Sequence, residues 1–442
     1  MQSNRWSAAI DGSRESPRRR IPLANKLTAW AKSLGPGLIT GAADDDPSGI
    51  ATYSIAGAFA GFSMLWAALI TTPMMAVLDG TCARIGLATD AGLMRSLARS
   101  MPRGLAIALA ILIGTANTFN IGADLDAMAA AAHLLAPIPP EVWLLVFTAV
   151  IIVVEVFFSY RAFADVMKWL CVTLFAYVIT AFIVHPRWPD VLWNTIVPHV
   201  RWNAAWLTTL TATLGTTITP YLFFWQTSMT AEERQARART SGSDQGVTVA
   251  RIRSAHGDAN TGAIYSNIVA FFIIVTCAST IGAHGSANIG TAQDAAEALR
   301  PLAGNFAFAL FTIGIVGTGL LAVPVLAGSS GYMFAELFGT REGLNLKPWR
   351  ARTFYAIIVV GLAAGAIMGL LRLDPIKALF WSAVFNGVAA VPVIYAIIRI
   401  ARDERVLGKW IVSRTAMVWL WLSLALMLAS AAGMVASWFI HT

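Results

Sequence analysis

Asp44-Asp45-Asp46-Pro47-Ser48-Gly49 is the stretch that decides the fold of this chain, because it lies within an apolar run over residues 34–66. Acidic side chains inside a membrane span are costly, and they are retained where they line a cavity, pair with another group or bind a cation. Pro47 has no amide hydrogen and disfavours a helical conformation at the residue before it, so we expect a helix break beside the acids. Carboxylates next to carbonyl groups released from helix bonding are cation ligands. The stretch therefore predicts a cation site at a broken membrane helix.

The composition of the whole chain is that of a multi-pass, all-α membrane protein. Of its 442 residues, 57% are hydrophobic and 13% are charged, and the mean hydropathy is +0.64. A membrane helix needs about 20 apolar residues, so the chain has room for about ten to twelve. The apolar runs predict eleven helices, near residues 35–60, 62–84, 104–135, 141–160, 164–185, 205–229, 261–282, 302–336, 353–371, 376–399 and 416–439.

The distribution of basic residues predicts the orientation. Basic residues collect in cytoplasmic loops, which favours a cytoplasmic N-terminus, an external C-terminus and the inner (cytoplasmic) membrane of a bacterial cell. All but five of the 32 Lys and Arg residues then lie inside. The five outside are Arg187, Arg201, Arg300, Arg372 and Lys377. The net charge of +8 is thus explained by topology, and we expect the lipid bilayer, not nucleic acid, as a partner.

The charged residues deep in the predicted spans are all acidic. They are Asp44, Asp45, Asp46, Asp79, Asp124, Asp126 and Glu155. A pathway lined by acids attracts cations and repels anions. Two of these acids have structural alternatives, an ion pair of Asp79 with Arg84 and one of Glu155 with Arg161.

A second proline interrupts the sixth predicted helix at Thr219-Pro220-Tyr221. Pro220 cannot donate to the carbonyl of Thr216, and Pro47 likewise releases the carbonyl of Ala43. Membrane helices also carry prolines without binding anything, but two breaks five spans apart indicate an inverted five-plus-five repeat with its site at the midplane. The predicted organisation is a polar cytoplasmic tail over 1–33, a first repeat over 34–186, a second repeat over 187–400, and a last helix with the C-terminus over 401–442.

These features resemble the Nramp family of divalent-metal transporters. Asp46-Pro47-Ser48-Gly49, preceded by Gly35-Pro36-Gly37, is similar to the Asp-Pro-Gly-Asn of the family's first helix. Thr219-Pro220-Tyr221 is similar to the Met-Pro-His of its sixth helix. An acid in the third helix and the count of eleven helices extend the likeness over nearly the whole chain. The resemblance implies a LeuT-type fold that moves divalent metal by alternating access, often with protons, and no enzymatic activity or resident cofactor.

Carried over to this sequence, the resemblance makes Asp46 the metal-binding aspartate and the Thr216 carbonyl the backbone ligand of the broken sixth helix. The carbonyl of Ala43 and the hydroxyl of Thr219 complete the expected set, with water in the remaining positions. Asp124 falls where the family has a third-helix acid involved in proton movement. Asp126 is two residues further on and points in a different direction, so at most one of these two acids faces the pathway.

The chain departs from the family at its ligands. Gly49 stands in place of the asparagine, Thr219 of the methionine and Tyr221 of the histidine, and the ninth-helix arginines are absent from Phe354–Leu371. Loss of the methionine resembles the Nramp-related magnesium branch. An all-oxygen set suits Mg²⁺, Ca²⁺ or Mn²⁺, whereas a thioether selects softer metals. The metal, and protons as a coupling ion, stay open.

Further candidates for the pathway or the proton route are Asp44, Asp45, Asp124, Gly49, Tyr221 and Gln226. Either Asp44 or Asp45 could replace the missing asparagine. Gln226 lies two turns after Thr219, where it either faces the pathway or joins helices. A transporter of the same fold with an amino-acid or other non-metal substrate is the alternative function, although acids beside the break would repel an amino-acid carboxylate.

Overall fold

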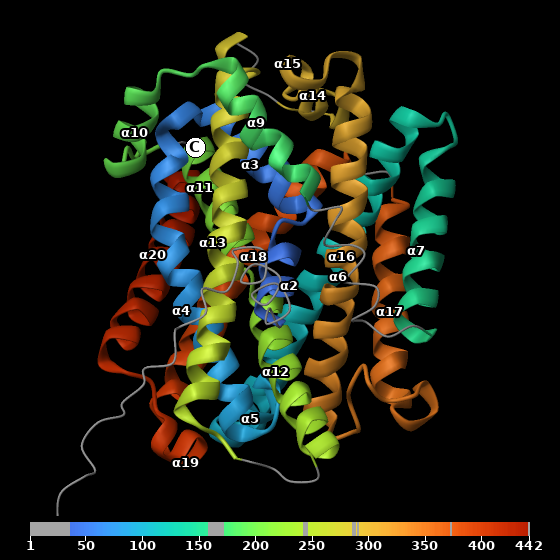
Figure 1. The fold of residues 1–442 in the computed structure, drawn as a ribbon, viewed down its shortest axis with the longest axis vertical. Coiled ribbons are helices and arrows are strands. Elements are labelled where there is room, and N and C mark those ends of the chain that lie inside the picture. The colour runs from blue at the N-terminus through green and yellow to red at the C-terminus, as the bar shows by residue number, and fades with distance from the viewer. Residues whose placement is uncertain are drawn as a thin grey trace, which may run out of the picture. The chain divides into compact units, whose positions relative to one another are not determined.

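The computed structural model describes residues 36–157, 172–241, 246–284, 289, 291–371 and 374–440, and within them the regular elements are all helices. Most of the long helices run along one direction and form a bundle (Figure 1). The long helices are α4 (Leu65–Thr89), α6 (Arg103–Leu135), α7 (Pro140–Phe157), α13 (Val249–Ser279), α16 (Ala307–Phe338), α17 (Arg352–Gly369), α18 (Pro375–Ala401) and α20 (Arg414–Ile440). Eight segments of the described chain are long and apolar enough to span a membrane. The count of eleven spans stays a prediction.

Both predicted helix breaks are present. The first separates α2 (Pro36–Asp44) from α3 (Pro47–Ala60), and the second separates α11 (Ala204–Thr217) from α12 (Pro220–Ser241). In each case the proline occupies the first position of the new helix, where its missing amide hydrogen costs no hydrogen bond. Proline therefore ends one helix and begins the next, as the sequence predicted.

Two groups of helices surround the breaks. α13 packs against α2, α3 and α4, whereas α6 packs against α16, α17 and α18. The contact of α2 with α13 is made by backbone, since a Cβ built on Gly41 would lie 2.4 Å from backbone atoms of Gly262. Glycine on both helices permits this close approach. The first break lies between α13 and α6, since Ser266 of α13 contacts Asp44 and Asn120 of α6 contacts Asp46.

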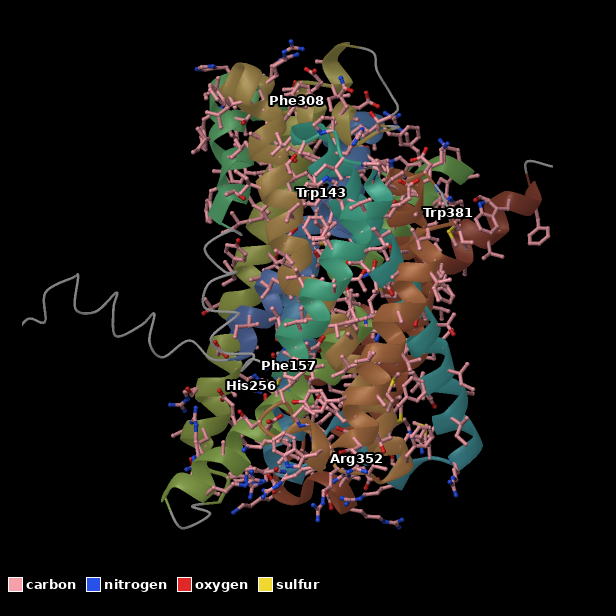
Figure 2. All side chains as sticks on the ribbon, turned by 90° about the vertical axis from the view of Figure 1, so that its right-hand side faces the viewer. Trp143, Phe157, His256, Phe308, Arg352 and Trp381 are labelled. Carbon is pink, nitrogen blue, oxygen red and sulfur yellow. The ribbon has the colours of Figure 1, made fainter. Side chains whose placement is uncertain are left out.

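Short helices that the hydropathy pattern did not predict lie at the two ends of the bundle. They are α5 (Leu93–Ser100), α10 (Trp188–Ile196), α14 (Ala292–Glu297), α15 (Arg300–Ala303) and α19 (Glu404–Leu407). The further short helix α9 (Phe175–Val184) is the described end of the fifth predicted span. α5 and α19 lie at one end and α10, α14 and α15 at the other (Figure 1). Figure 2 labels Arg352 at the first end and Phe308 at the second. α13 begins at Val249, well before the predicted start at 261, because Thr248 caps it and its polar first turns escape a hydropathy scan.

Candidate functional site

Asp46 lies in the first break and faces α6. It is 3% exposed, and its extended backbone makes it the N-cap of α3, with Oδ1 accepting the amide of Gly49 at 2.6 Å. The other carboxylate oxygen accepts a hydrogen bond from Asn120 Nδ2 at 3.1 Å. Asp124 follows Asn120 one turn later on the same face of α6, is fully buried, and has no hydrogen-bond partner for either oxygen within the described residues. Asp126, by contrast, is partly exposed.

A chain of polar groups from α18 supports this arrangement. Ser382 Oγ donates to Asn120 Oδ1 at 2.8 Å, and Ser48 Oγ lies 3.1 Å from Ser382 Oγ and donates to the carbonyl of Leu379. Asn120, Ser48 and Ser382 were not identified from the sequence. The spacing of Asn120 and Asp124 on one helical face was the available signal. These contacts fix the orientation of the Asp46 carboxylate from two other helices.

The two breaks face one another. At each break, a carbonyl oxygen that proline leaves without its usual amide donor accepts a hydrogen bond from a side-chain hydroxyl. Tyr221 OH donates to the carbonyl of Ala43 at 3.0 Å. Thr219 Oγ1 donates to the carbonyl of Thr216 at 2.6 Å. A carbonyl oxygen has two lone pairs, so each of these oxygens has capacity for a second partner. The structure thus places the expected backbone ligands at the breaks with one lone pair of each already used.

Gly49 lies in close contact with oxygen atoms from both breaks. A Cβ at this position would lie 3.2 Å from the carbonyl oxygen of Asp44, 3.3 Å from Thr216 Oγ1 and 3.5 Å from Asp46 Oδ1. The Thr216 hydroxyl makes no hydrogen bond within the described part of the chain. Two predicted site residues, one from each break, therefore meet at the position where the side chain is missing.

Asp44 and Asp45 belong to a different surface of the break. Ser266 of α13 donates to Asp44 Oδ2 at 2.6 Å and also lies 3.3 Å from Asp45 Oδ1. Both acids are buried, and the second oxygen of each has no hydrogen-bond partner among the described residues. The three consecutive acids are consequently divided, with Asp46 facing α6 and the other two facing α13.

The remaining candidates have structural neighbours. Gln226 accepts a hydrogen bond from Thr40 Oγ1 at 2.6 Å, which joins α12 to α2. The alternative pair of Asp79 with Arg84 is not formed. Arg84 donates to the carbonyl of Ile411 and lies 3.4 Å from His256, and Asp79 Oδ1 has no hydrogen-bond partner among the described residues. Residues five apart on a helix are about 140° apart around its axis, which keeps the two side chains from meeting.

Glu155 was expected to pair with Arg161, which lies outside the described residues. Its own oxygens are buried and have no hydrogen-bond partner in the described part. Across the described residues, no group of three or more His, Cys, Asp or Glu side chains is close enough to hold a metal ion. A metal at the breaks would therefore be held by one carboxylate with hydroxyl, carbonyl and water oxygens.

A helical bundle with two broken helices, whose breaks enclose a buried aspartate, defines a multi-pass membrane transporter. A sequence model of the natural resistance-associated macrophage protein-like (Nramp) family matches residues 37–437. The chain therefore belongs to the Nramp family, which is a family of membrane metal transporters and not of enzymes.

Curated relatives are similar to this chain over most of its length, and solved structures share its fold. The divalent metal cation transporter MntH of Granulibacter bethesdensis is 25% identical, over 94% of this chain and 93% of that protein. MntH 1 of Pseudomonas aeruginosa is also 25% identical, over 94% of each. The manganese transporter of Eremococcus coleocola shares the fold, with a TM-score of 0.70 and 19% identity over 93% of this chain and 89% of that one. MhsT, solved with L-phenylalanine, gives a TM-score of 0.57 at 14% identity over 91% of this chain and 97% of that one.

Proposed function

We propose that this chain moves a divalent metal cation across the membrane by alternating access, with the metal bound between the two helix breaks. The observation that carries the proposal is the convergence of three oxygen atoms at Gly49, from Asp46, the carbonyl of Asp44 and the hydroxyl of Thr216. Membership of a metal-transporter family supports the same cargo. Asp46 would supply the negative charge.

The backbone ligands of the proposal are the carbonyls of Ala43 and Thr216. Each now accepts a hydroxyl, so the metal would either take the second lone pair or displace the hydroxyl donor. The hydroxyl of Thr219 donates its hydrogen to the Thr216 carbonyl and keeps its oxygen lone pairs for a cation. Water would fill the other positions.

The proposed cargo is a hard cation of the Mg²⁺ or Mn²⁺ type. All the candidate ligand atoms are oxygen, and such a set suits Mg²⁺, Ca²⁺ and Mn²⁺ better than softer metals. Manganese is the metal named for the structural relative from Eremococcus coleocola. Asp124 is the candidate for accompanying proton movement, since it is buried beside Asn120 on the same face of α6.

Ala43, Asp46 and Thr216 are buried in this structure, so alternating access requires the helices to move. We propose that α2 and α12, which end at the breaks, open the end that carries α5 and α19. The excess of basic residues assigns this end to the cytoplasm, with the N-terminus inside and the inner membrane as the location.

The proposal is tested by metal uptake into proteoliposomes, with Mn²⁺ and Mg²⁺ in parallel and the internal pH recorded. We expect Asp46→Ala to abolish saturable uptake, because the site would lose its charged ligand. Asp126→Asn is the matched control, since it neutralises a partly exposed acid on α6 that lies away from the site. Acidification during uptake would show proton coupling.

Two outcomes would contradict the proposal. If Asp46→Ala takes up metal saturably at the wild-type rate, the metal does not bind at the first break. Absence of metal uptake by the wild type, together with uptake of an amino acid, would favour a non-metal substrate on the same fold.

A further inference from the structure

A cavity of about 500 Å³ lies at the end of the bundle that carries α5. Three segments line it: Arg95 of α5, Gln235 and Arg239 of α12, and residues between α16 and α17. The last group comprises Gly339, Thr340, Arg341, Glu342, Leu346 and Arg350. Figure 2 labels Arg352, two residues beyond this group, at the same end. We refer to this space as the arginine cavity.

Positive charge dominates the arginine cavity. Its one acid, Glu342, is paired with Arg95, whose Nη2 lies 2.6 Å from Glu342 Oε1. The other three arginines, Arg239, Arg341 and Arg350, are exposed and make no ion pair with any described residue. Three guanidinium groups that line one cavity and form no ion pair with a described residue repel one another, and an anion would relieve this repulsion.

Two exposed aromatic residues are next in sequence to residues that line the arginine cavity. Phe338 and Trp349, which precede the lining residues Gly339 and Arg350, are 61% and 62% exposed. Aromatic side chains of this kind collect at the boundary between membrane and water. This end of the bundle therefore carries side chains suited to the edge of the bilayer as well as phosphate-binding groups.

The cavity also lies where α12 is attached to its neighbours. Glu232 of α12 accepts hydrogen bonds from the hydroxyl of Tyr332, from the amide of Leu344 at 3.2 Å and from the amide of Asn345 at 2.8 Å. An anion held by Arg239 on one side and by Arg341 and Arg350 on the other would join the same two parts of the chain.

We propose that the arginine cavity is a binding site for a phosphate-bearing anion, which bridges α12 to the segment between α16 and α17. Guanidinium groups match phosphate oxygens with pairs of charge-assisted hydrogen bonds. The phosphate comes either from an anionic phospholipid headgroup or from a soluble phosphate compound. The site is separate from the helix breaks, and the proposal does not depend on metal transport.

The test measures binding to the full-length protein in nanodiscs. One arm compares phosphatidylcholine with and without phosphatidylglycerol and counts retained lipid by native mass spectrometry. The other arm titrates inorganic phosphate into protein in phosphatidylcholine alone and follows thermal unfolding. Retention of phosphatidylglycerol identifies the lipid as the source, and stabilisation by inorganic phosphate identifies a soluble compound.

Two sets of variants distinguish specific anion binding in the arginine cavity from general attraction to a positively charged surface. Arg239→Gln, Arg341→Gln and Arg350→Gln together should weaken binding by about tenfold or more, because several charge-assisted hydrogen bonds are lost. The matched control replaces Arg399, Arg402 and Arg405, which are also exposed but do not line the cavity. Size-exclusion chromatography checks that each variant is folded. An equal loss in the control, or no anion binding by the wild type, would overturn the proposal.

Discussion

The hydroxyl of Tyr221 lies 3.0 Å from the carbonyl oxygen of Ala43 and joins two helix breaks that are 178 residues apart in the sequence. The Tyr221 hydroxyl at the second break donates this hydrogen bond to the Ala43 carbonyl, which Pro47 leaves without its usual amide donor. It also makes Tyr221, which stands where the family has a histidine, part of the closed arrangement of the site.

Replacing Tyr221 with Phe removes this donor and leaves the buried Ala43 carbonyl with one partner fewer. Loss of such a hydrogen bond costs about 1–3 kcal/mol, so we expect a lower thermal unfolding midpoint without metal. If Ala43 is a ligand, added Mn²⁺ or Mg²⁺ should narrow the difference from the wild type, because the metal supplies the missing partner. A difference that metal leaves unchanged would argue against Ala43.

Asn120→Ala tests the orientation of Asp46. The variant loses the hydrogen bond from Asn120 Nδ2 to the Asp46 carboxylate, and we expect the KM for metal uptake to rise about tenfold, as for loss of one group that orients a metal ligand. Ser382→Ala removes the donor that holds Asn120 and should give a smaller rise. Equal KM values for the wild type and Asn120→Ala would show that Asp46 is oriented without this helix.

Gly49→Ala should impair metal uptake, because its Cβ would enter the space between Asp46 Oδ1 and Thr216 Oγ1. Gly257→Ala is the matched control, since a Cβ on Gly257 of α13 meets nothing within 4 Å. The measurement is the rate of metal uptake by Gly49→Ala and by Gly257→Ala at a saturating metal concentration. If Gly49→Ala takes up metal at the wild-type rate, the metal does not bind beside Gly49.

The double variant Gly49→Asn and Thr219→Met should shift selectivity toward softer metals. It introduces an amide oxygen and a thioether, and thioether ligands favour softer ions. The measurement is competition of Cd²⁺ and Mg²⁺ against Mn²⁺ uptake. If the order of preference among Cd²⁺, Mg²⁺ and Mn²⁺ is the same as in the wild type, positions 49 and 219 do not belong to the ligand set.

Anion binding to the arginine cavity should strengthen as the pH falls. Burial raises the pKa of the Glu342 carboxyl, Arg95 opposes this shift, and the charge on Glu232 adds to it. Below that raised pKa, Glu342 is neutral and Arg95 is released for the anion, so affinity rises. The other ionisable groups around it are Glu336, Arg239, Arg341 and Arg350.

Glu342→Gln is the variant that checks this pH dependence. It should bind phosphate more tightly than the wild type at neutral pH, and the difference should shrink as the pH falls, because Glu342 then becomes neutral in the wild type as well. Phosphate titrations of both proteins between mildly acidic and neutral pH measure this difference, and the ionisation of phosphate itself affects both proteins equally. A difference in affinity that does not change with pH would show that Glu342 is not the group responsible.

The sequence predicted those features that depend on local chemistry. Pro47 and Pro220 break their helices because a missing amide hydrogen acts on the residue's own backbone. Ser382 meets Asn120 across 262 residues of chain, and a contact of this kind depends on tertiary packing that no local pattern records. The separation of Asp46 from its acidic neighbours also required the structure, since it follows from the extended backbone at this one residue.

The attachment of Glu232 has a kinetic consequence. One carboxylate on α12 accepts hydrogen bonds from Tyr332, Leu344 and Asn345, so separation of α12 from the neighbouring segment requires the replacement of three hydrogen bonds to a single charge. We expect the three bonds to break together in a single slow step. The turnover number of the transporter would then be set by the release of this carboxylate, far from the residues that select the ion.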